Sequence, residues 1–67
     1  MTLYTSDYLM GISEGREMLR RCGPGIARAE FDNLTRTIRL FDSSSPVGQL
    51  LRGQRDFWRN QIKAGKA

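Results

Sequence analysis

Residues 27–41, ARAEFDNLTRTIRLF, carry the clearest pattern in the chain. Apolar side chains recur there at spacings of four, three, four and three residues: Ala27, Phe31, Leu34, Ile38 and Phe41. This spacing places them on one narrow stripe of an α-helix, while charged residues occupy the outward positions. We therefore predict a helix over about residues 25–41 and expect the rest of the chain to pack against it.

A first helix is expected over about residues 6–22. Thr5 suits its N-cap, because the hydroxyl can accept a hydrogen bond from a free amide of the first turn. Gly23-Pro24-Gly25 ends this helix, since glycine suits the position just past a helix end and proline cannot continue the helix. The connection to the next helix is so short that the two should form an antiparallel hairpin.

Two glycines, Gly11 and Gly15, lie on the apolar face of this first helix. Each costs about 1 kcal/mol relative to alanine inside a helix. One interpretation is that another backbone approaches closely at these positions. The other is that the glycines are merely tolerated weak points, and the sequence does not choose between the two.

A third helix is expected over about residues 46–64, with Ser45 as its N-cap and Pro46 at the first helical position. Nowhere does the sequence alternate in the way of a β-strand. The fold class predicted is all-α: a helical hairpin plus a third amphipathic helix, in one small domain over residues 1–67.

The length of 67 residues limits how this domain is stabilised. A chain this short buries only about 60% of its unfolded surface and is marginal as a monomer. Small domains therefore recruit disulfides, a metal or a second subunit. Cys22 is the sole cysteine and histidine is absent, so no intrachain disulfide can form and a structural zinc is not expected. We expect self-association instead, in the form of a homodimer.

Catalysis is the function class that the composition most clearly excludes. Without histidine, Ser-His and Cys-His arrangements cannot form. Cys22 is expected to be buried and inert on the apolar face, where the C-terminal end of a helix disfavours a thiolate. We expect no enzymatic activity, no catalytic residue, no metal and no cofactor. The lone cysteine and the absence of a signal-peptide pattern at residues 1–9 fit a cytoplasmic protein.

The third helix presents the most informative surface. Gln54 and Gln61 lie near the centre of an apolar face that includes Phe57 and Trp58. A polar residue in a helical seam can fix its register, although the same glutamines would reach water if the face were partly exposed. Tryptophan and arginine are enriched at binding hot spots, and this face has both. The predicted protein-binding residues are Leu50, Gln54, Phe57, Trp58, Gln61 and Ile62.

The last 22 residues, which contain this helix, carry the whole net charge of +4. Five cations set against Asp56 form a basic stripe beside the apolar face: Arg52, Arg55, Arg59, Lys63 and Lys66. Such a stripe could bind DNA or RNA phosphates, and a third helix after a serine-rich turn is also the order of helix-turn-helix domains. Ser43, Ser44 and Gln49 would then be further contacts. A membrane-surface role is not expected, because the apolar face is needed to cover the other two helices.

These patterns favour a small non-enzymatic regulator that binds a larger cytoplasmic protein and inhibits or redirects it. The size would suit a bacterial or phage protein, for example an antagonist of a transcription factor. The alternative is a small helix-turn-helix-like protein that binds DNA or RNA through the basic stripe.

Overall fold

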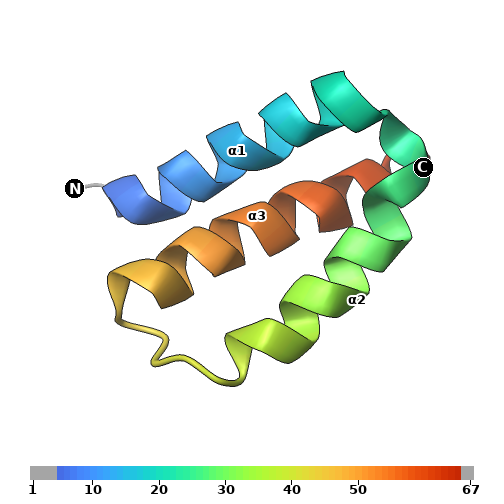
Figure 1. Cartoon of the computed structure of the whole chain (residues 1–67). Coiled ribbons are helices and arrows are strands. Elements are labelled where there is room, and N and C mark those ends of the chain that lie inside the picture. The colour runs from blue at the N-terminus through green and yellow to red at the C-terminus, as the bar shows by residue number, and fades with distance from the viewer. Residues whose placement is uncertain (1–4, 66–67) are drawn as a thin grey trace.

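The computed structural model describes residues 5–65, which fold into three α-helices and contain no β-strand. Helix α1 spans Ser6–Cys22, α2 spans Ala27–Ile38 and α3 spans Pro46–Lys63. A short 3₁₀ turn, η1 (Pro24–Ile26), connects α1 to α2 (Figure 1). The all-α fold class predicted from the sequence is confirmed.

Both predicted N-caps are present. The Thr5 hydroxyl accepts a hydrogen bond from the backbone nitrogen of Tyr8 at 3.1 Å. The Ser45 hydroxyl accepts one from the backbone nitrogen of Gly48 at the same distance, and Pro46 occupies the first turn of α3. These side chains satisfy amides that have no partner inside their own helix.

Helix α2 ends earlier than its apolar stripe predicts, at Ile38 instead of Phe41. The backbone nitrogen of Leu40 bonds the Thr37 carbonyl and that of Phe41 bonds the Ile38 carbonyl, at 3.0 and 3.1 Å. Each of these bonds joins residues three positions apart, as in a 3₁₀-helix, so α-helical geometry ends before Phe41. The Thr37 hydroxyl also donates to a carbonyl four residues earlier, that of Asn33, a contact that often bends helices.

The central helix is α3, which lies between α1 and α2 (Figure 1). Helices α1 and α2 each pack chiefly on α3 and make little direct contact with one another. The chain does reverse at η1, but the expected hairpin of the first two helices does not form as a packed pair. The helix over residues 27–41 is likewise not the one around which the others gather.

Close approach of α1 and α3 explains this arrangement. A methyl group added at Gly11 would overlap the carbonyl oxygen of Leu50 and lie 2.9 Å from the backbone nitrogen of Gln54. One added at Gly53 would overlap the carbonyl oxygen of Tyr8. Both contacts are therefore between backbones, which only glycine permits. The structure thus decides for close approach at Gly11.

The core lies where α3 meets α2. Trp58 is 1% exposed and Ala27 is fully buried, with Leu34 and Phe57 beside them. The Phe57 and Trp58 rings meet edge to face, with centroids 5.2 Å apart and an interplanar angle of 79°. Phe57 also reaches α1, where its ring would lie 2.7 Å from a methyl group placed at Gly15. The apolar face of α3 therefore packs against both α1 and α2.

Candidate binding surfaces on α1 and α3

The structure buries two of the six predicted protein-binding residues and leaves the other four half-buried. Phe57 and Trp58 are buried, and Leu50 and Ile62 are half-buried against the neighbouring helices. The reason is the central position of α3, because two helices cover the face that the sequence left open for a partner. A partner could reach the two aromatic rings only if α3 were unpacked. Their part in binding a partner stays a prediction, and the structure shows that the neighbouring helices cover Phe57 and Trp58 within one chain.

Gln54 and Gln61 differ from the buried aromatics, because both are half-buried. The Gln54 amide nitrogen donates to a carboxylate oxygen of Glu14 on α1 at 3.1 Å. This bond connects α3 to an exposed residue, so Gln54 is at the edge of the helix interface and not in a closed seam. Gln54 is the predicted binding residue that the structure brings to an open site.

That open site is a cleft of about 430 Å³ beside α1. Its lining comes from five residues of α1 and one of α3: Glu14, Glu17, Met18, Arg21, Cys22 and Gln54. We call it the α1 cleft. Met18 is 38% exposed there, although it lies on the same face of α1 as Gly11 and Gly15. Cys22, which was expected to be buried, is exposed and lines the cleft.

Charges surround the apolar lining of the α1 cleft. Glu14 is exposed and accepts the hydrogen bond from Gln54. Glu17 accepts hydrogen bonds from the Arg20 guanidinium, which raise the pKa of Arg20 above its usual value. Both groups of this ion pair are largely exposed, so it adds little to stability. Arg21 also lines the cleft, so its apolar floor is bordered by two carboxylates and one guanidinium, and Glu14 is the one of these two carboxylates without an ion pair among those of residues 5–65.

Sequence reasoning missed this cleft, although one signal was present. Met10, Glu14 and Met18 follow one another at intervals of four residues, which makes a continuous stripe along α1. Met10 and Met18 are both exposed. The stripe crosses one edge of the glycine face: Met18 lies on that face, whereas Met10 lies outside it. Whether another helix covers this stripe depends on the position of α2, which the sequence does not reveal.

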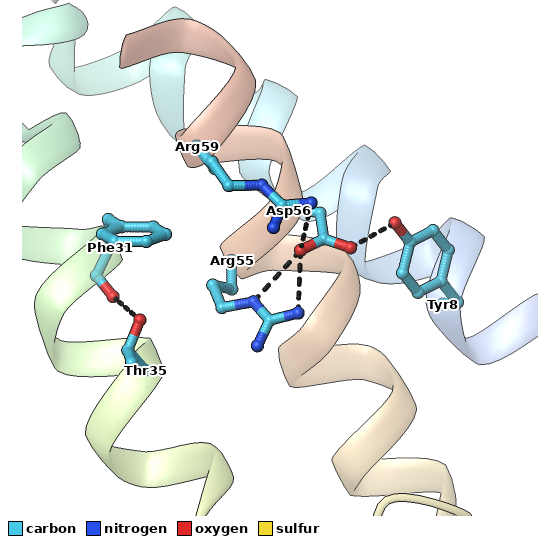
Figure 2. A network of polar contacts seen from close by, with 6 residues as sticks. All are labelled: Tyr8, Phe31, Thr35, Arg55, Asp56 and Arg59. Carbon is cyan, nitrogen blue, oxygen red and sulfur yellow. Dashed lines mark hydrogen bonds and ion pairs between the residues drawn. The ribbon is translucent and has the colours of Figure 1, made fainter. Parts of the chain in front are cut away.

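Two cations of the basic stripe, Arg55 and Arg59, pair with the single carboxylate of Asp56 (Figure 2). One Asp56 oxygen lies 3.0 Å from a guanidinium nitrogen of Arg55 and 3.3 Å from one of Arg59. The other oxygen accepts a hydrogen bond of 2.6 Å from the Tyr8 hydroxyl of α1. Asp56 therefore joins the stripe to α1. Lys66 lies outside the described residues.

The described residues give no sign of a metal centre or of a membrane span. Within residues 5–65, no group of three or more Cys, Asp or Glu side chains is placed to hold a metal ion. None of the helices in that range is long and apolar enough to cross a membrane. Comparison with known proteins gives no match to a family model, to a curated protein or to a solved structure.

Proposed function

We propose that this protein is a small non-enzymatic regulator that binds a larger protein through the α1 cleft and so inhibits or redirects it. The observation that carries the proposal is the exposure of Met18 in a cleft that Glu14, Glu17 and Arg21 border. Methionine is flexible and polarizable, and it is common on surfaces that accept varied apolar side chains. Of the protein-binding residues predicted from the sequence, this site includes Gln54 but not the buried Phe57 and Trp58.

The lining defines the chemistry of the partner segment. An apolar side chain would enter beside Met18 and Cys22, and a lysine or arginine next to it would meet Glu14 at the rim. An amphipathic helix with both residue types on one face fits this pattern, as in other complexes where a helix lies in a groove. The partner is therefore expected to present a basic amphipathic helix.

Panning a displayed library of random peptides against the purified protein tests this proposal. Enriched peptides should combine apolar residues at intervals of three or four with an adjacent lysine or arginine. Met18→Lys should weaken their binding by more than about fivefold, the usual threshold of a hot-spot residue. Leu9→Lys is the matched control, because nine residues place Leu9 on about the opposite side of α1 from Met18.

Equal binding of the enriched peptides to wild type and to Met18→Lys would contradict the proposal. A library that yields no binder would also contradict it. Circular dichroism of both variants shows whether the fold is retained.

We also propose that the protein is a homodimer, with the second copy seated on the apolar surface around the α2–α3 connection. Leu40 is 80% exposed just after the end of α2, Phe41 next to it in sequence is exposed, and so is Val47 at the start of α3. Backbone and hydroxyl bonds from Ser45 to the Asp42 carbonyl fix the turn between them. Light scattering over a concentration series should give twice the chain mass of 7.7 kDa, at low and moderate salt alike. A mass of one chain throughout would contradict the dimer.

A further inference from the structure

The side of α3 that faces away from the α1 cleft carries four cations, which we call the basic face: Arg52, Arg55, Arg59 and Lys63. They follow one another at intervals of three or four residues, so they form one stripe about 16 Å long. Lys63 lies nine residues after Gln54, which places it about half a turn away from the cleft. The basic face is therefore separate from the proposed protein-binding site.

The internal ion pairs neutralise only part of this charge. Asp56 is shared between Arg55 and Arg59, so one carboxylate faces two guanidinium groups. Figure 2 shows Arg55 lying between α2 and the Asp56 carboxylate, whereas Arg59 approaches it from the next turn of α3. The Arg59 side chain is 48% exposed, compared with 23% for Arg55. Arg59 is thus the member of this group that a ligand can reach.

Arg52 and Lys63 extend the unneutralised charge in both directions. Among the ion pairs of residues 5–65, none involves either side chain. Arg52 is half-buried, and its Nε is buried without a hydrogen-bond acceptor in the described residues. A guanidinium held by packing, with no carboxylate beside it, has already lost much of its conformational freedom before binding. Lys63 is exposed in the last turn of α3.

We propose that the basic face binds the phosphodiester backbone of a nucleic acid, without reading its sequence. Arg52, Arg59 and Lys63 would each contact a phosphate. Base reading is not part of the proposal, because the residues at the start of α3 are engaged within the protein. Gln49 donates to the Ser43 carbonyl, and Ser44 donates twice to the Asp42 carboxylate. The polar side chains at the start of α3 thus already have partners within the protein.

A lipid surface fits the basic face less well than a nucleic acid. Peripheral membrane helices insert apolar or aromatic residues next to their cations. The tryptophan adjacent to Arg59 is Trp58, which is 1% exposed and held in the core. The basic face thus supplies positive charge but no apolar anchor. Positive charge is sufficient to bind phosphates, whereas a membrane helix needs the anchor as well.

Fluorescence anisotropy with a labelled duplex of random sequence, and with one of its single strands, tests this proposal. For three duplex contacts, affinity should fall roughly 40-fold between about 50 and about 200 mM salt. Lys63→Gln and Arg59→Gln should each reduce the magnitude of the salt slope by about 0.9. Arg20→Gln is the matched control: it removes the same charge from an exposed, ion-paired residue of α1.

Binding of either oligonucleotide with these slopes supports the proposal, and the ratio of the two affinities shows which form is preferred. Absence of binding at the lower salt would overturn it. An equal loss from Arg20→Gln and Lys63→Gln would also overturn it, because net charge alone would then explain the affinity. Retention on phosphatidylserine vesicles without oligonucleotide binding would assign the basic face to lipid instead. Lys63 is exposed near the end of α3, so its replacement should leave the fold intact.

Discussion

Replacing Gly11 by alanine tests the contact that organises the fold. The added methyl group would overlap the carbonyl oxygen of Leu50 and lie 3.0 Å from its carbonyl carbon. Those atoms belong to the backbone of α3, which is fixed by its own helical hydrogen bonds. They cannot rotate away as a side chain could, so α1 and α3 would have to separate.

The expected loss follows from two opposing effects. In an exposed helix the change from glycine to alanine would stabilise by up to about 1 kcal/mol. Overpacking in a fixed environment costs about 1–3 kcal/mol, and contact with backbone atoms favours the upper end. The net result is a destabilisation of about 2 kcal/mol. Proteins have about 0.05–0.15 kcal/mol of stability per residue, so a chain of 67 residues would lose a large part of its total.

Thermal unfolding followed by far-UV circular dichroism measures this effect. A loss of about 2 kcal/mol corresponds to a midpoint lowered by roughly 8–16 °C in a domain of this size. Gly25→Ala is the control, since no atom lies within 4 Å of a methyl group there, and its midpoint should stay unchanged or rise slightly. A midpoint for Gly11→Ala that equals or exceeds the wild-type value would refute the close approach of α1 and α3.

Two further predictions concern the core and the α2–α3 turn. Trp58→Ala should cost about 3–5 kcal/mol and abolish the cooperative thermal transition, whereas a folded variant would contradict the burial of this ring. Hydrogen bonds from the backbone nitrogen and hydroxyl of Ser44 lower the pKa of Asp42 below its ordinary value of 3.8. Because the folded pKa is the lower one, the stabilisation is present above the unfolded value and is lost as pH falls through the folded value. Asp42→Asn should therefore flatten the acid side of a plot of thermal midpoint against pH, and parallel wild-type and variant curves would contradict this.

The helices and their starting points could be predicted because their causes are local. Thr5 and Ser45 cap their helices through residues only three positions away, and Pro46 needs nothing beyond its own ring geometry. The early end of α2 was harder, because the stripe of apolar residues continues to Phe41. Turn bonds at Leu40 and Phe41 compete with the helix there, and their strength depends on the connection to α3.

The candidate site was less predictable, since exposure depends on which helix covers which face. Trp58 and Met18 both lie on apolar faces in the sequence, yet one is buried and the other is open. An apolar stripe shows that a face needs cover but does not name the segment that covers it. The hydrogen bond from Tyr8 to Asp56 joins residues 48 positions apart, and no local pattern pairs them.

The sequence by itself determined that this protein is all-α, with three amphipathic helices, defined caps and a basic last helix. Caps, periodicity and charge depend on residues only a few positions apart, so they can be read from the sequence without knowledge of the tertiary contacts. Only the tertiary structure decided that α3 lies between α1 and α2. That choice depends on the backbone approach at Gly11 and Gly53, where the absence of a side chain lets two distant segments touch.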